Sequence, residues 1–111
     1  MAIYDFAEGV VLVTLPAESR VNDELNGINE TVVVKGDRDV VIDFSAVEIV
    51  DSAALSNLLI LHDLLSQRKR RLILCSVSFP TKCIFMVAGL EKVFEFAEDR
   101  QAALEAVQHT G

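Results

Sequence analysis

The chain has few of the residues on which several protein classes depend. Its 111 residues include two prolines, two cysteines and two histidines, and this composition excludes collagen-like and disordered classes. Long apolar runs are also missing. Four polar residues, among them His62 and Asp63, interrupt the most apolar window, Leu55–Leu65. A membrane span needs roughly 20 apolar residues, so we expect a soluble chain without one.

The cysteines and histidines are not spaced as metal ligands. Seven residues separate Cys75 from Cys83, and both lie in apolar surroundings, so we predict two buried, reduced thiols rather than a zinc knuckle or a CxxC redox pair. His62 and His109 have no acidic or thiol partner at a ligand spacing. We therefore predict no metal and no cofactor. No basic, apolar leader opens the chain, and we expect a cytoplasmic location.

Basic residues are scarce as well. Ten Lys and Arg stand against 17 Asp and Glu, and the net charge is −7. Such a balance repels nucleic-acid phosphates and anionic lipid surfaces, so we expect neither as a partner. The basic cluster Arg68–Arg71 joins an apolar helical run to a strand-like run. It is more typical of a solvated helix end than of a nucleic-acid or lipid-headgroup patch.

The residues that are present predict one α/β domain over 1–111. The chain is 51% hydrophobic and 24% charged, as in ordinary globular proteins. Strand and helix patterns alternate, which indicates a sheet of about five strands, partly parallel, covered by about four helices. The predicted strands are 3–6, 10–15, 39–44, 72–77 and 93–96. The predicted helices are 22–34, 52–67, 80–88 and one that begins at 98–99.

Motifs for catalysis are missing too. The chain contains no GxSxG elbow, no GxxxxGK[ST] loop and no GxGxxG turn, and the corresponding hydrolase and nucleotide-binding hypotheses lose their usual support. Asp37, Asp39 and Asp43 are predicted to have solvated or capping roles rather than to act as paired catalytic carboxylates. A small enzyme or nucleotide-binding protein working at the strand ends remains an alternative.

One position stands out as a candidate site. Asp51 and Ser52 follow the predicted central strand 39–44 and begin the helix 52–67, at the carboxyl edge of a parallel sheet where ligands commonly bind. We expect an exposed Ser52 hydroxyl. A phosphate there would carry about two negative charges and would lie at a helix N-terminus. The alternative is that Asp51 or Ser52 is simply the N-cap.

The residues around this position resemble STAS domains. The resemblance is carried by Val40–Val47 followed by Asp51–Leu55, and it continues through 72–75, 84–94 and 98–104. It covers about 38–107. It implies a STAS-like mixed sheet that is mostly parallel in its centre.

In anti-sigma factor antagonists of this family, the serine after the motif aspartate is phosphorylated by an anti-sigma factor that is also a serine kinase. Ser52 matches that serine. The resemblance thus implies a bacterial signalling protein without enzymatic activity that regulates transcription through a sigma factor. Its unphosphorylated form would bind the anti-sigma factor, and a phosphatase would reverse the modification. The implied partner-binding residues are Asp51, Ser52, Ala53, Ala54, Leu55 and Glu18.

Two departures from the family pattern keep a second hypothesis open. Ala53–Ser56 stands where the family commonly has a second hydroxyl residue and then Gly-Leu-Gly, and in the loop Pro16–Arg20 only Glu18 is matched. The alternative is a constitutive STAS subunit of a stress-sensing or lipid-transport assembly, without a phosphorylation cycle. The sequence does not fix the oligomeric state.

Overall fold

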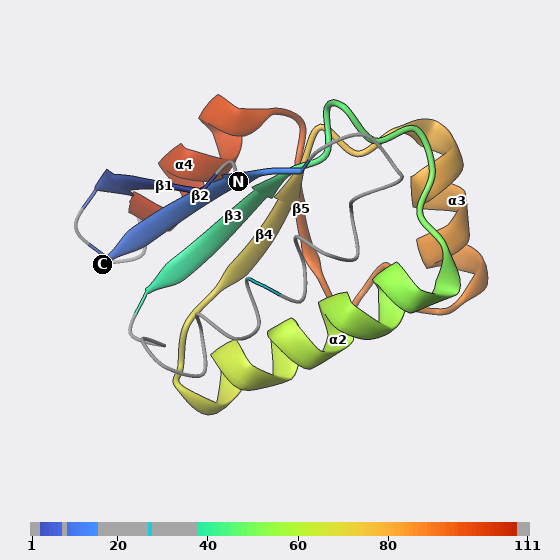
Figure 1. Ribbon diagram of the computed structural model, residues 1–111, viewed down its shortest axis with the longest axis horizontal. Helices are drawn as coiled ribbons and strands as arrows, with labels where there is room; N and C mark the ends of the chain where they lie inside the picture. Colours follow the sequence, from blue (N-terminus) through green and yellow to red (C-terminus); the bar gives the residue numbers. More distant parts are fainter. Residues whose placement is uncertain (1–2, 8, 16–26, 28–37, 109–111) are drawn as a thin grey trace.

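A mixed sheet with helices on both faces forms the centre of the molecule (Figure 1). The computed structural model describes residues 3–7, 9–15, 27 and 38–108, and every structural statement below concerns these residues. The strand order is β1-β2-β3-β4-β5, with β1 antiparallel to β2 and all other neighbours parallel. The predicted α/β class is confirmed. The strands are β1 (Ile3–Ala7), β2 (Val10–Thr14), β3 (Asp39–Asp43), β4 (Leu72–Cys75) and β5 (Glu95–Ala97).

The three described helices divide between the two faces of the sheet. They are α2 (Ser52–Gln67), α3 (Phe79–Val87) and α4 (Arg100–Gln108). Helices α2 and α3 pack on one face and α4 on the other (Figure 1). No described helix combines the length and the apolar character that crossing a membrane requires. The predicted helix 22–34 lies, apart from Gly27, outside the described residues.

Alternation along the strands produces two separate cores. In β3, Val40 and Ile42 join the core under α2 and α3, whereas Val41 joins the core under α4. Both faces are covered, so β3 and β4 are almost continuous apolar runs, as expected of central parallel strands. The first core is filled mainly by leucines of α2 and by Phe85 of α3, which is fully buried.

Local signals account for most element boundaries. Gly9 has a φ of 83° in the turn between β1 and β2, and Gly89 has a φ of 73° after α3, and in both places a side chain would be strained. Helix α3 begins with the N-cap Ser78, and Pro80 lies in its first turn. The predicted strand 93–96 starts two residues before β5 and ends one residue before its end, because Val93 and Phe94 belong to the turn and bend that precede β5.

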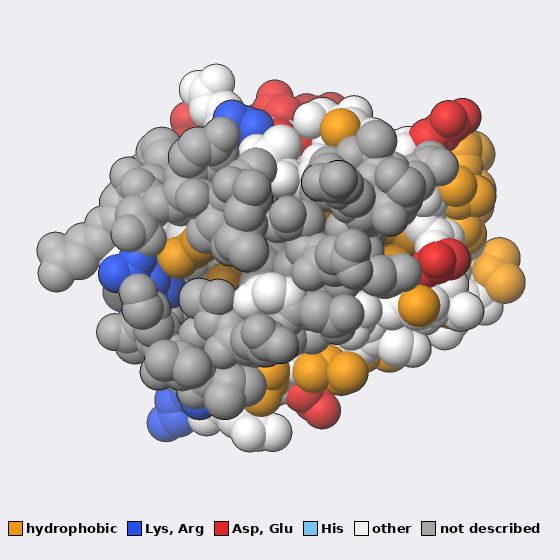
Figure 2. All heavy atoms as spheres, in the orientation of Figure 1, with side chains coloured by type: hydrophobic (Ala, Val, Ile, Leu, Met, Phe, Trp, Pro, Cys, Tyr) orange, Lys and Arg blue, Asp and Glu red, His pale blue; other side chains and the backbone are white. Residues whose placement is uncertain are grey.

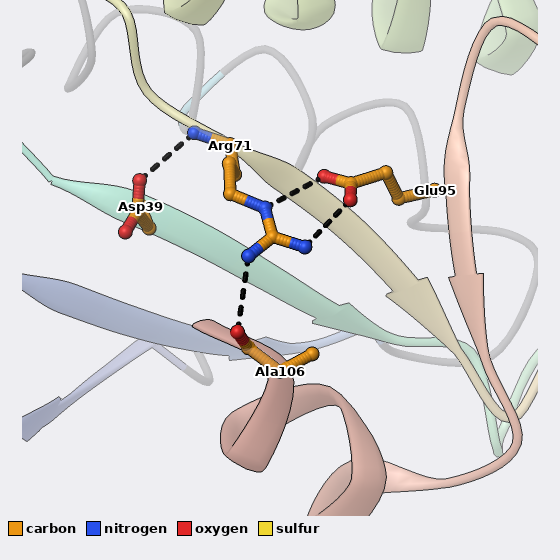
Figure 3. Close-up of polar contacts among 4 residues, drawn as sticks. All are labelled: Asp39, Arg71, Glu95 and Ala106. Carbon is orange, nitrogen blue, oxygen red and sulfur yellow. Dashed lines mark hydrogen bonds and ion pairs between the residues drawn. The ribbon is translucent and has the colours of Figure 1, made fainter. Parts of the chain in front are cut away.

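Arg71 ties three elements together at the amino end of β4 (Figure 3). Its guanidinium donates to both carboxylate oxygens of Glu95 in β5, at 2.6 and 3.0 Å, and to the carbonyl of Ala106 near the end of α4, at 3.0 Å. Its backbone N–H donates to Asp39 at 2.8 Å. The prediction of a solvated basic cluster is therefore correct only in part. Arg68 and Lys69 are exposed at the helix end, but Arg71 joins β4 to β5 and α4.

Candidate functional site

The loop 44–51 carries the chain from the end of β3 to the start of α2. Phe44, Val47 and Val50 are buried in the core, with exposed fractions of 1%, 3% and 6%. Between them the loop exposes Glu48 and Ile49. Every third residue is thus anchored, and the loop leads from the carboxyl end of β3 past α3 to the start of α2 (Figure 1).

Asp51 is the N-cap of α2, one of the two candidates that the sequence offered. Its Oδ1 accepts a hydrogen bond from the Ala54 N–H at 2.8 Å, and its carbonyl accepts one from Leu55 at 3.1 Å. Ser52 is the first residue of the helix and is exposed, as are Asp51 and Ala53. Ser52 is therefore a surface residue at a helix N-terminus, next in sequence to the exposed Asp51.

The other predicted surface residues lie differently. Ala54 is 1% exposed and belongs to the core, so its side chain does not lie on the surface with Ser52. Its place follows from helical periodicity, because it shares a stripe with Leu58 and Leu61. Leu55 is half-buried against the same core. Glu18 lies outside the described residues.

Replacing Asp51 tests the cap. Asp51→Ala removes the acceptor of the Ala54 N–H and is expected to lower the free energy of unfolding by about 1 kcal/mol. Urea denaturation measures the loss. Asp51→Asn retains a capping oxygen and should stay close to the wild type; an equal loss in both variants would contradict the capping role.

An ion pair with a buried carboxylate lies at the end of β3. Asp43 is 3% exposed, and Arg100 of α4 donates to its Oδ2 at 2.6 and 3.1 Å. Arg100 also donates to the hydroxyl of Thr14 at 3.0 Å. Burial acts to raise the pKa of Asp43, but hydrogen bonds from Arg100 and Ser45 and the charge of Arg100 outweigh it, and the pKa lies below its ordinary value. Asp43 Oδ1 accepts a hydrogen bond from the Ser45 N–H at 2.8 Å, and its side chain is buried rather than solvated.

These groups are unsuited to catalysis. Asp43 stays ionised and is held by Arg100, which leaves it a poor general acid or base at neutral pH. Burial, reinforced by the charge of Asp43, raises the pKa of the Cys75 thiol to about 11, so this thiol remains protonated and weakly nucleophilic. Cys83 is half-buried, not fully buried as predicted. In the described part of the chain no cluster of three or more His, Cys, Asp or Glu side chains is arranged to hold a metal.

Helix α3 presents an apolar outer face. Phe79, Met86 and Val87 are 70%, 62% and 90% exposed, and Cys83, Ile84, Val87 and Ala88 line an open apolar hollow of about 320 Å³. Figure 2 shows hydrophobic side chains along the edge of the molecule where α3 lies, with acidic side chains among them. An exposed apolar surface of this kind is typical of a site for another protein.

Sequence reasoning missed Arg100, Thr14 and Arg71 as partners. Arg100 and Asp43 are 57 positions apart, and Arg71 and Glu95 are 24 apart. No local pattern reports such pairs. The one available signal was Asp43, a charged residue inside an apolar strand, because a buried charge is costly unless it is paired.

Comparisons with known proteins agree with this architecture. The family model described as STAS domain matches residues 11–103. A candidate anti-sigma factor antagonist of Bordetella bronchiseptica, BtrV, is 32% identical over 74 residues; the match covers 67% of this chain and 64% of that protein. The chain thus matches a little under two thirds of the length of this relative.

Solved structures give the same fold. The anti-sigma factor antagonist (STAS) domain protein of Planctomyces limnophilus superimposes with a TM-score of 0.82 at 21% identity, over 97% of this chain and 99% of its own. The Bacillus cell fate determinant SpoIIAA in its phosphorylated form gives 0.71 at 17% identity, over 94% and 96%. The predicted resemblance is confirmed: the chain belongs to the STAS domain family.

Proposed function

We propose that this chain is an anti-sigma factor antagonist switched by phosphorylation of Ser52. In this proposal the unphosphorylated chain binds an anti-sigma factor that is also a serine kinase, and a phosphatase restores the binding form. The chain acts by binding in the cytoplasm and catalyses no reaction. The surface around Asp51, Ser52, Ala53 and Leu55 meets the partner, with Glu18 as a further proposed contact.

The exposure of Ser52 at the first residue of α2 carries the proposal. A kinase reaches this hydroxyl without unfolding any element. The helix dipole favours an anion at this end, so the protein can hold the phosphate in place. The phosphorylated form of SpoIIAA, a structural neighbour, supports the proposal because it shows that a protein with this fold accepts the modification.

Two buried groups at the ends of β3 and β4 are poorly suited to catalysis, which supports a binding role. The buried carboxylate of Asp43 is neutralised by Arg100, and the Cys75 thiol remains protonated. The charged groups near the strand ends therefore serve the fold rather than a reaction. The net charge of −7 disfavours direct contact with nucleic acid.

Phosphorylation of Ser52 is tested by co-expressing the protein with candidate serine kinases of its source organism. Intact-mass analysis and peptide mapping are expected to find one phosphate, on Ser52. Ser52→Ala should abolish it, whereas Ser56→Ala, which alters an exposed serine one turn further along α2, should not. A phosphate that persists in Ser52→Ala, or its absence with every kinase, would contradict the proposal.

A second candidate function is a constitutive subunit of a larger complex. The apolar outer face of α3, with Val87 90% exposed, favours this alternative because such a face suits a permanent contact. It predicts that the chain copurifies with its partner in the same amount whether Ser52 is intact, replaced by Ala or phosphorylated. The switch instead predicts that copurification with the anti-sigma factor falls once ATP allows that kinase to phosphorylate Ser52, and that Ser52→Ala prevents this fall.

A further inference from the structure

Two hydroxyl groups of α3 converge on one backbone oxygen in the loop 44–51. Ser78 Oγ donates to the carbonyl of Glu48, and Thr81 Oγ1 donates to the same oxygen at 3.2 Å. A carbonyl oxygen accepts two hydrogen bonds, so this one is fully used. The contacts span 30 and 33 positions of sequence and join the start of α3 to the loop that leads to Ser52.

The Thr81 hydroxyl is placed for this contact. Its residue is 0% exposed, and Asp43 is the other buried polar residue in the described part of the chain. A hydroxyl in such a place is costly unless it is hydrogen-bonded. The cap of α3 is already supplied by Ser78, whose Oγ accepts the Thr81 N–H at 3.3 Å. Thr81 Oγ1 also lies 3.1 Å from Ser78 Oγ, so the two hydroxyls and the Glu48 carbonyl form one network. These polar contacts account for a hydroxyl at position 81, where a valine would fill the same space.

The contact of the Glu48 carbonyl with Ser78 and Thr81 adds to the hydrogen bond that the Val47 N–H donates to the carbonyl of Phe44 at 2.9 Å. Val47 and Val50 hold the loop through apolar burial, which does not depend on direction. Hydrogen bonds do depend on it. The two hydroxyls therefore set the orientation of the peptide between the two valines, and with it the path by which Asp51 and Ser52 enter α2.

We propose that Ser78 and Thr81 are positioning residues for Ser52. In this role they act through the carbonyl of Glu48. They fix the Glu48 peptide, and this peptide fixes the direction in which the start of α2 presents Ser52. The kinetic part of this inference rests on the proposed function, since it concerns phosphorylation of Ser52; the structural part does not.

Hydrogen exchange in the free protein tests the structural part. Thr81→Val removes one hydroxyl and keeps the shape, while Thr81→Ser keeps the hydroxyl. Ser78→Gly removes the other and leaves a residue that α3 tolerates at its N-cap. The reporter is the Ala54 amide, bonded to Asp51 at 2.8 Å; the internal control is the Ala102 amide, bonded to Asp99 at the same distance at the start of α4.

Loss of one hydroxyl is expected to speed exchange at Ala54 about fivefold, the factor that corresponds to one hydrogen bond of typical net strength. Exchange at Ala102 should not change, and Thr81→Ser should behave as the wild type. Equal acceleration at both amides would show a general loss of stability, and no acceleration at Ala54 would show that the contact positions nothing. Either result overturns the inference.

Phosphorylation kinetics test the rest, with the kinase that modifies Ser52. We expect kcat/KM to fall about fivefold in Thr81→Val, to fall further when Ser78→Gly is added, and to recover in Thr81→Ser. Normal kinetics in Thr81→Val, with Ser52 phosphorylated in the wild type, would overturn the inference and leave the proposed function intact. A wild type that is never phosphorylated would overturn the proposed function and the kinetic part, and hydrogen exchange would still decide the structural part.

Discussion

Replacing Arg100 with Met is expected to lower the free energy of unfolding by about 2 kcal/mol at neutral pH, because it leaves the carboxylate of Asp43 buried without its cation. Methionine keeps the apolar stem and removes the charge. The full penalty for breaking a buried pair is about 3–5 kcal/mol. The Arg100 side chain is 46% exposed, so water reaches the pair and reduces the loss. Urea denaturation at pH 7 measures it.

The loss should depend on pH in a definite direction. In the wild type the pKa of Asp43 lies below its ordinary value of 3.8, so its stabilising effect is present at neutral pH and disappears as the pH falls through the lowered pKa. In Arg100→Met, only the hydrogen bonds from Ser45 still oppose the effect of burial on Asp43, so the pKa of Asp43 is higher than in the wild type. Protonation then removes the unpaired charge, and the gap between the two proteins should narrow toward about pH 4.

A second substitution serves as the control. Adding Asp43→Asn to Arg100→Met replaces the buried charge with a neutral amide and should recover much of the lost stability at pH 7. The account of the ion pair is wrong if Arg100→Met is as stable as the wild type, or if the double variant is less stable than Arg100→Met alone.

Phosphorylation of Ser52 is expected to weaken binding of the anti-sigma factor at least about 100-fold. The phosphate would add about two negative charges next to the exposed residue Asp51. A surface that docks over Ser52 when it is uncharged must then bury or repel this dianion, which costs several kcal/mol at a complementary interface. Isothermal titration calorimetry on the two forms measures the difference.

Elements governed by local patterns were predicted well. The apolar run 39–44 predicted β3, and the polar residues before the leucine-rich stretch predicted the start of α2 at Ser52. Both signals lie within a few residues of the feature that they specify. Closer attention to periodicity would also have placed Ala54 in the core, because it lies four residues before Leu58 and seven before Leu61.

Contacts between distant segments could not be predicted in this way. The pairing of Asp43 with Arg100, and the two hydroxyls of α3 on the Glu48 carbonyl, depend on how β3, α3 and α4 are placed around the sheet. A sequence shows each partner but not their proximity. The candidate acceptor Ser52 was identified from its position after a central strand and from the family resemblance, and the structure adds that it is exposed.

The central claim is that one phosphate on Ser52 changes what the chain binds. Its most direct test is to titrate the kinase that modifies Ser52, at physiological ionic strength, with unmodified protein, with phosphorylated protein and with phosphorylated protein that has been treated with a phosphatase. The account predicts tight binding by the first and third samples and binding at least about 100-fold weaker by the second. Equal affinity of all three samples would contradict it and would favour the constitutive subunit.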